Sequence, residues 1–332
     1  MRAVVVGEFG GPEVLRVERR DVPVPGHGDV SIDVAYAGVN FAEVAARKGA
    51  VPGLEPPLVP GLEVAGMVRE VGSGVADLSV GDPVCAFTAV GGYAEVAVAS
   101  AAATHRLPDA GDDTLRRGAA LPTIVPTAWA LVEEVARVRS GEDVLVAAAA
   151  GGVGSVAVQF ARRAGARRVF GIVSTPEKAT YAAGFGYDAA FLEPTWREEL
   201  DAATDGRGVD VVLDSVGGTF RRQAFDVLAP MGRLVLFGNA SGEPEAAPAG
   251  GAMRTQCKGA IGFSITGLTR NDPATARRYT EQALRIALDE DLRIDITQVL
   301  PLEEAWRAHE ALERRRTTGK LVLAVGGAAT GA

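Results

Sequence analysis

Cysteine and histidine are scarce in this chain. Its 332 residues contain only two cysteines and three histidines. Cys85 and Cys257 lie far apart in the sequence, which excludes a disulfide framework and makes a reducing cytoplasm the expected compartment. His27, His105 and His309 do not combine with the cysteines into the spacing of a tetrahedral zinc site, so we expect no metal.

The sequence also lacks long apolar runs and an excess of positive charge. No apolar stretch approaches the ~20 residues that a membrane-spanning helix needs, and the first residues have neither the apolar core nor the cleavage site of a signal peptide. The formal net charge of −8 argues against a nucleic-acid partner. We therefore expect a globular protein with no membrane or nucleic-acid partner, and the length favours two domains.

The chain has two regions with different sequence patterns. Up to about residue 120, short β-type runs are separated by Gly and Pro, with one helical stretch at 41–48, which predicts a compact, mostly antiparallel β domain. From residue 119 onward, helical and apolar strand-like segments alternate, which predicts an α/β fold with a doubly wound parallel sheet. The expected strands are 3–6, 15–19, 30–37, 65–71, 83–86, 93–99, 144–149, 168–173, 189–191, 209–213, 234–237, 260–265 and 320–324. The expected helices are 127–138, 153–164, 177–183, 196–204, 218–228, 273–288 and 302–313.

A glycine-rich turn is the central feature of the second region. Gly152, Gly154 and Ala157 form G-x-G-x-x-A between an apolar strand and a helix of small residues. Gly152 permits the sharp turn, Gly154 lets the backbone approach a pyrophosphate, and Ala157 lets helix and strand pack closely. Helix N-terminal N–H groups favour such an anion. The pattern predicts a Rossmann dinucleotide site whose turn consists of Ala150, Gly151, Gly152, Val153 and Gly154.

The end of the next strand indicates which dinucleotide binds. NAD-dependent enzymes commonly place Asp or Glu here to bind the adenosine ribose. This chain has Ser174 and Thr175 with Lys178 one turn on, and hydroxyls with a cation suit a 2′-phosphate that a carboxylate would repel. The same residues also fit a helix N-cap followed by Pro176 and Glu177, and both interpretations can hold together. We expect NADPH as the cofactor.

Several short motifs, in this order and spacing, resemble the zinc-free quinone oxidoreductase (zeta-crystallin-like) branch of the medium-chain dehydrogenase/reductase superfamily. They span nearly the whole chain: 38–42 (GVNFA), 59–66 (VPGLEVAG), 81–84 (GDPV), 92–95 (GYAE), 127–129 (TAW), 150–154 (AGGVG), 209–218 (VDVVLDSVGG), 232–235 (GRLV) and 316–322 (RTTGKLV). The resemblance implies a β-rich, GroES-like catalytic domain of residues 1–122 and 267–332 and a Rossmann domain of residues 123–266. Zinc-dependent relatives have Cys near Asn40 and His at Leu62, so their ligands are missing here.

The resemblance also implies site residues. It places the nicotinamide near Asn40, Thr127 and Val216, with Asn40 and Thr127 as the catalytic candidates, because an amide can both donate and accept. Asn40 and Thr127 equally fit helix N-caps. Further cofactor contacts are implied for Gly238, Asn239, Phe263, Ser264 and Lys320.

Two departures from the family pattern affect the expected reaction. Val51 stands where many enoyl reductases have a proton-donating Tyr, and Glu193 stands near a Tyr that often lies by the 2′-phosphate. The first departure weakens an assignment as an enoyl reductase that relies on Tyr, whereas a quinone needs less from the protein because solvent can protonate its product. The second departure slightly weakens the argument for a 2′-phosphate site. We expect a quinone or another electron-poor α,β-unsaturated carbonyl compound as the electrophilic small-molecule substrate. A pathway-specific enoyl or enone reductase and a non-catalytic NADPH-binding protein remain alternatives. The apolar strand at 260–265 and the family habit predict a homodimer.

Overall fold

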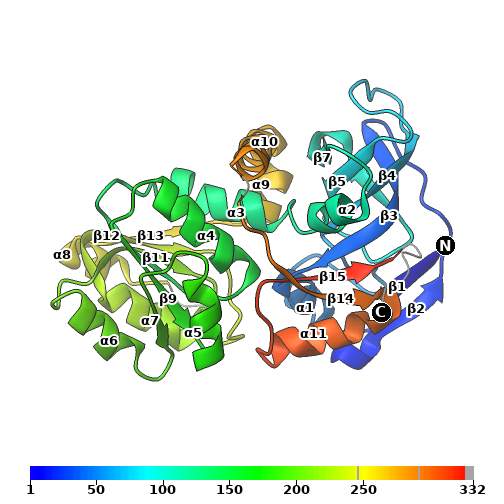
Figure 1. Ribbon diagram of the computed structural model, residues 1–332. Helices are drawn as coiled ribbons and strands as arrows, with labels where there is room; N and C mark the ends of the chain where they lie inside the picture. The colour runs from blue at the N-terminus through cyan, green and yellow to red at the C-terminus, as the bar shows by residue number, and fades with distance from the viewer. Residues whose placement is uncertain (245–246, 291, 326–332) are drawn as a thin grey trace. The chain divides into compact units, whose positions relative to one another are not determined.

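The structure, a computed structural model, describes residues 1–244, 247–290 and 292–325. Its contacts divide the chain into two compact units. Unit 1 comprises residues 1–123 together with the chain from 294 onward, and unit 2 comprises residues 124–293. Figure 1 shows the elements of both units along the chain.

Unit 2 contains a six-stranded parallel sheet in the order β10-β9-β8-β11-β12-β13. Its strands are β8 (Asp143–Val146), β9 (Arg168–Val173), β10 (Ala189–Leu192), β11 (Val209–Asp214), β12 (Leu228–Leu236) and β13 (Gly259–Gly262). The strand order reverses between β8 and β11, where Leu145 is in register with Val212. In open α/β sheets, ligands bind at the carboxyl ends of the strands beside such a reversal. The predicted doubly wound fold is confirmed.

Helices separate the strands of unit 2 in sequence. They are α3 (Ile124–Trp129), the π-helical stretch η3 (Ala130–Val135), α4 (Gly152–Arg163), α5 (Pro176–Ala183), α6 (Trp196–Ala203), α7 (Gly218–Asp226), α8 (Gly250–Gln256), α9 (Ile265–Asn271) and α10 (Pro273–Asp289). One buried core joins the sheet to α6 and α7, with Leu145, Phe170 and Trp196 among its members. Because the central strands are buried on both faces, they consist almost entirely of apolar residues.

Unit 1 is mostly antiparallel. Its main sheet has the order β14-β15-β3-β4-β5-β7, with β6 also paired to β3, and β1 pairs with β2 in a separate ribbon. The elements are β1 (Arg2–Val6), η1 (Pro12–Val14), β2 (Leu15–Arg19), β3 (Asp29–Val39), α1 (Phe41–Arg47), β4 (Glu63–Val71), β5 (Pro83–Phe87), β6 (Val96–Ser100), η2 (Ala101–Ala103), β7 (Thr104–Arg106), α2 (Asp112–Gly118), β14 (Ile296–Pro301), η4 (Leu302–Glu304), α11 (Ala305–Glu313) and β15 (Lys320–Ala324). The last strand, red in Figure 1, lies antiparallel beside the blue β3, so the carboxyl-terminal part of the chain completes the amino-terminal domain.

The structure corrects several expected boundaries. The strand expected at 260–265 ends at Gly262, and α9 begins at Ile265. The helix expected at 127–138 begins earlier, at Ile124, and continues as a π-helix from Ala130. Residues 267–293, expected in the β-rich domain, group with unit 2 because α10 packs on α3, where the Trp129 and Tyr279 rings meet edge-on at 5.1 Å. Sequence reasoning missed α2, α8, α9, β7 and β14.

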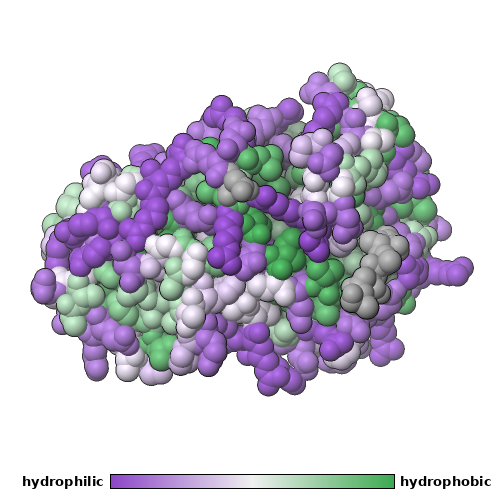
Figure 2. Space-filling model, in the orientation of Figure 1, coloured by the Kyte–Doolittle hydropathy of each residue, from purple (hydrophilic) through white to green (hydrophobic). Residues whose placement is uncertain are grey.

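Hydrophilic residues predominate on the visible face of each unit in Figure 2. The large apolar side chains that are exposed lie singly on many elements, and Met231 and Val24 are the most exposed at 80% and 79%. Scattered exposure of this kind is normal for a globular surface. None of the helices that the structure describes has the length and apolar composition of a membrane span.

Candidate cofactor and active site

The predicted glycine turn follows β8 directly. Gly151 is the N-cap of α4, whose first turn carries no acidic side chain, and Ala148 has the left-handed φ of 51°. A Cβ on Gly154 would lie 2.6 Å from the carbonyl oxygen of Ala148, so only glycine fits there. The 12-residue helix α4 therefore presents its N-terminal N–H groups at the carboxyl end of the sheet, where an anion is favoured.

The end of β9 carries the residues predicted to select the dinucleotide. Ser174 and Lys178 are half-buried, and the Thr175 hydroxyl accepts the Lys178 N–H at 3.3 Å as the N-cap of α5. The capping interpretation is therefore confirmed. Glu193, just after β10, donates its N–H to the Val173 carbonyl at 3.1 Å and so lies beside the same strand end. Contact of Ser174 and Lys178 with a 2′-phosphate stays a prediction.

A buried ion pair organises the ends of β11 and β12. The Arg221 Nε lies 2.7 Å from Asp214 Oδ2, and these side chains are 2% and 0% exposed. Asp214 Oδ1 accepts the N–H groups of Val216 and Gly217 at 2.8 and 2.9 Å, while Arg221 Nη2 donates to the Gly238 carbonyl at 2.6 Å. The pair thus fixes two segments that carry predicted cofactor residues. Sequence reasoning missed it, although a lone Asp ending a strand before Gly-Gly was a visible signal.

The remaining candidates of unit 2 have local structural roles. Thr127 lies inside α3 and is buried, so the interpretation of Thr127 as an N-cap before a helix at Ala128 is wrong. Ser264 is the N-cap of α9 and accepts the Gly267 N–H at 3.0 Å, and Phe263 donates its N–H to Leu236 at 2.8 Å. The contacts of all three residues with cofactor or substrate stay predictions.

In unit 1, four polar residues form one buried group, which we call the Lys320 cluster: Asn40, Glu43, Glu63 and Lys320. The Lys320 ammonium donates to the Val39 carbonyl at 2.9 Å and to Asn40 Oδ1 at 2.5 Å, and it lies 2.5 Å from Glu63 Oε1. The two carboxylates and the ammonium are at most 3% exposed. The cluster therefore places a cation between polar oxygens inside the β domain.

The amide of Asn40 is oriented by these partners. Its Nδ2 donates to Glu63 Oε1 at 2.9 Å and to Glu43 Oε1 at 3.3 Å, so the nitrogen must face the carboxylates and the oxygen must face Lys320. Asn40 is also the N-cap of α1, and its N–H donates to Glu43 Oε2 at 2.9 Å. The helix-capping alternative is confirmed. Both amide N–H groups are engaged, so direct donation to a substrate carbonyl requires exchanging one of these bonds.

Burial changes the acidity of groups in and around the cluster. Burial raises the pKa of Glu43 to about 7, with Glu63 adding to the rise and Lys320 opposing it. Burial, followed by the charge of Glu63, raises the pKa of the Cys85 thiol to about 12. Burial, with the nearby Glu43 and Glu63 charges, raises the pKa of Tyr93 well above its ordinary value. Cys85 and Tyr93 are therefore neutral at pH 7, and Glu43 titrates close to it.

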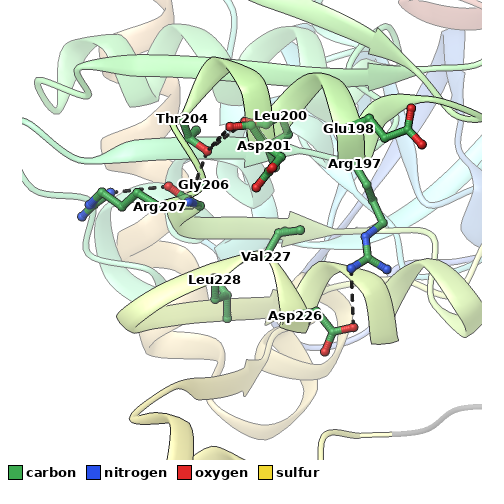
Figure 3. A pocket seen from close by; sticks show the side chains of 11 residues that line it. Arg197, Glu198, Leu200, Asp201, Thr204, Gly206, Arg207, Asp226, Val227 and Leu228 are labelled. Atoms are coloured by element: carbon green, nitrogen blue, oxygen red, sulfur yellow. Dashed lines mark hydrogen bonds and ion pairs between the residues drawn. The ribbon is translucent and has the colours of Figure 1, made fainter.

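Within the described residues, no three or more His, Cys, Asp or Glu side chains come together in a way that could hold a metal ion. A surface hollow in unit 2 contains none of the predicted site residues. Figure 3 shows this hollow at the amino ends of β11 and β12, with Arg197 directed toward Asp226 at 4.0 Å. Its lining mixes acidic and basic side chains, so it does not select an anion.

Two family descriptions match the chain. "Zinc-binding dehydrogenase" matches residues 152–282, and "Alcohol dehydrogenase GroES-like domain" matches residues 26–109. The quinone oxidoreductase of Pseudomonas aeruginosa is 36% identical over 95% of this chain and 97% of its own. The 2-haloacrylate reductase of a Burkholderia species is 32% identical over 97% of this chain and 98% of its own. The structure of Escherichia coli quinone oxidoreductase complexed with NADPH has a TM-score of 0.89 and 30% identity, covering 98% of this chain and all of that one.

Each of these relatives matches this chain over nearly its full length, so the matches include both unit 1 and unit 2. Unit 1 is β-rich as the resemblance implied, and its GroES-like part is confirmed by the match to residues 26–109. The chain belongs to the quinone oxidoreductase branch of the medium-chain dehydrogenase/reductase superfamily and is an oxidoreductase of that family.

Proposed function

We propose that this protein is an NADPH-dependent reductase that transfers hydride to quinones or other α,β-unsaturated carbonyl compounds without zinc. The observation that carries the proposal is the pair of adjoining strand ends: a glycine turn without acidic neighbours after β8, and Ser174, Thr175 and Lys178 rather than a carboxylate at the end of β9. The Escherichia coli neighbour was solved with NADPH, which supports the same cofactor.

The residues of unit 2 fit this cofactor. Gly151 to Gly154 would hold the pyrophosphate, because Gly154 allows close approach and the start of α4 supplies N–H donors. Ser174 and Lys178 would hold the 2′-phosphate through a hydroxyl and a cation. Val216, Gly238, Asn239, Phe263 and Ser264 would border the nicotinamide half. NADPH supplies the hydride, and solvent can protonate a reduced quinone.

For Asn40, Thr127 and Lys320 we propose roles on the substrate side. The contact of Lys320 with the cofactor stays a prediction, and its ammonium also binds the Val39 carbonyl, Asn40 Oδ1 and Glu63 Oε1. It therefore acts on Asn40, whose carbonyl oxygen it holds. Asn40 in turn orients the substrate carbonyl by exchanging a carboxylate partner for it.

A second candidate function is a pathway-specific enoyl or enone reductase. The Burkholderia relative is named for the reduction of a haloacrylate, an α,β-unsaturated acid, which supports a carbon–carbon double bond as the site of reduction. The chemistry is the same hydride transfer, but the product carbanion needs a proton. Val51, where enoyl reductases have Tyr, cannot supply that proton.

The decisive experiment measures oxidation of NADPH and of NADH with 9,10-phenanthrenequinone, 1,4-benzoquinone and a simple enone. Quinone turnover with strong preference for NADPH is the expected result. Turnover of the enone alone would favour the second candidate. Tight NADPH binding with no turnover across the panel would contradict the first candidate and favour either a pathway-specific enone reductase or a non-catalytic NADPH-binding protein.

We also propose that the protein is a cytoplasmic homodimer. Within the described residues, β13 pairs only with β12, and Ile261 on β13 is 43% exposed, so this sheet edge can pair with a second copy. Both cysteines are free, as expected in a reducing compartment. A monomer in sedimentation at micromolar concentration would refute the dimer.

A further inference from the structure

The loop of residues 237–243, which follows β12, is bound to the segment that follows β11. Phe237 donates its N–H to the Asp214 carbonyl at 2.9 Å, Ala240 to Ser215 at 3.0 Å, and Ser241 to Val216 at 2.9 Å. The loop therefore runs along the carboxyl edge of the sheet, where it carries Gly238 and Asn239. This edge is the ligand-binding edge of a doubly wound fold.

Glu243 ties the far end of this loop to helix α7. Its Oε2 accepts the backbone N–H of Thr219 at 2.9 Å and the Thr219 hydroxyl at 3.1 Å. Thr219 is in the first turn of α7, so its N–H has no acceptor within the helix, and the helix dipole favours a carboxylate there. No other residue of the loop places a charged group on α7 among the interactions described.

The same residue also fixes the side chain of Asn239. The Glu243 carbonyl accepts Asn239 Nδ2 at 2.9 Å, and the Glu243 N–H donates to the Ser241 hydroxyl at 3.2 Å. That hydroxyl donates in turn to Asn239 Oδ1 at 3.2 Å. The direction of the Asn239 amide therefore depends on where Glu243 is held.

Two consecutive glycines provide the space for these contacts. Gly217 and Gly218 have φ values of 77° and 55°. A Cβ on Gly217 would lie 2.1 Å from Asn239 Oδ1, and one on Gly218 would lie 2.6 Å from the Glu243 carboxyl. Each glycine is thus required by a different residue of the loop.

We propose that Glu243 is a positioning residue for the nicotinamide end of the cofactor, because its carboxylate fastens the loop 237–243 to the first turn of α7. The inference rests on the proposed function, since it assumes that this loop borders NADPH. A loop fastened before binding loses less conformational entropy when the cofactor arrives. The carboxylate also sets the orientation in which Gly238 and Asn239 meet the nicotinamide.

The test compares wild type with E243A and E243Q, with E198A as the matched control. Glu198 is an exposed carboxylate in the first turn of α6. By the usual strength of a hydrogen bond to a charged group, E243A is expected to raise the Kd for NADPH about tenfold. E243Q, which keeps one acceptor oxygen, should recover part of that loss, and E198A should change nothing. Because Glu243 is exposed and its loss removes one helix-terminal contact, the Tm of E243A and E243Q should fall by only a few degrees, and each variant should remain folded.

A kinetic readout separates positioning from simple support of the fold. With NADPH deuterated at the transferred position, E243A should show a larger isotope effect on kcat than wild type, since misorientation makes hydride transfer more rate-limiting. Equal Kd values and isotope effects for wild type and E243A would overturn the inference while leaving the proposed function intact. A wild type that does not bind NADPH would overturn the proposed function itself, and the inference with it.

A double-mutant cycle tests the contact directly. G218A places a methyl group against the Glu243 carboxyl and should raise the Kd for NADPH roughly tenfold in the wild-type background. In the E243A background that clash is absent, so G218A should raise the Kd for NADPH less than about threefold. Additive effects on the Kd would show that Gly218 and Glu243 act independently. The proposal that Glu243 fastens the loop 237–243 to α7 would then be wrong.

Discussion

Replacing Glu43 by Gln should remove a pH dependence of stability that runs opposite to the one usual for a carboxylate. Burial is the main cause of the raised pKa of Glu43, which is about 7 in the folded chain against an ordinary value of 4.5. The folded state therefore binds a proton more tightly than the unfolded state. The stabilisation is fully present below pH 4.5 and is lost as the pH rises through 7.

The size of the effect follows from the two pKa values. At about 1.4 kcal/mol per pKa unit, the difference corresponds to about 3 kcal/mol of unfolding free energy between pH 4.5 and a pH above 7. The groups that face Glu43 are Lys320, Glu63 and Tyr93. Tyr93 does not titrate in this window, because burial raises the pKa of its phenol well above the ordinary value.

The chosen variant keeps the shape of the site. Gln is neutral and, like a protonated carboxyl, combines an acceptor oxygen with a donor group, so E43Q imitates the neutral form at every pH. The assay is urea unfolding followed by circular dichroism from pH 4 to 8.5, with hydrogen exchange of β3 and β4 peptides to assign the transition to unit 1. E8Q, at an exposed position of the same unit, is the control.

The expected result is a difference in unfolding free energy between wild type and E43Q that moves in favour of E43Q by about 3 kcal/mol as the pH rises. Using the difference cancels the titration of every other group. A difference that stays constant across this range would show that Glu43 ionises as readily in the folded chain as in water. The account of the Lys320 cluster as a desolvated site would then be wrong.

Three further predictions follow from other parts of the structure. Burial, followed by the charge of Arg47, lowers the pKa of His309 to about 3. The free energy of unfolding of wild type should therefore fall by about 2 kcal/mol between pH 6.5 and 5, because the unfolded chain binds a proton there that the folded chain does not. The variant H309F should lose much less in the same urea titration. The substitution G154V should abolish NADPH binding in a fluorescence titration, because its Cβ would lie 2.6 Å from the Ala148 carbonyl oxygen at the turn. The control G251A, at a helix glycine with open space around it and no positive φ, should bind normally. The substitution S174D should raise the KM for NADPH at least about tenfold and leave that for NADH nearly unchanged, since a carboxylate repels a 2′-phosphate; equal changes for both cofactors would place the phosphate elsewhere.

The sequence predicted the features of this fold that are local. The turn at Gly151 and Gly154 was visible because strand, glycines and helix are consecutive, and α4 begins at Gly152, one residue before the prediction. The helix at 265–271 was missed because it is short and contains a glycine and two threonines, which are weak helix formers. What decided between strand and helix was the N-cap at Ser264, whose hydroxyl accepts the Gly267 N–H.

The Lys320 cluster could not be predicted from local pattern. Asn40 and Lys320 are 280 residues apart, and only the antiparallel pairing of β15 with β3 brings them together. The family resemblance identified both residues but not the contact between them, because a motif gives no direction to a side chain. Direction depends on partners, and both carboxylate partners of Asn40, Glu43 and Glu63, are ordinary acidic residues in the sequence.

The same reasoning explains why the glycine pair at 217–218 was noticed while its purpose was not. A glycine in a sequence can indicate a position where a side chain does not fit, but the sequence does not show which neighbouring residue leaves no room for that side chain. Here the neighbours are Asn239 and Glu243, which come from the segment after the next strand. The buried Asp214, which precedes the pair, accepts the Gly217 N–H, and the exposed Glu243 accepts the Thr219 N–H of α7. The turn is therefore held from two sides by carboxylates. Removing the buried carboxylate of Asp214 would leave the Arg221 cation buried without its counter-charge, which is strongly destabilising. Glu243 is exposed, so this edge of the site is better tested through Glu243.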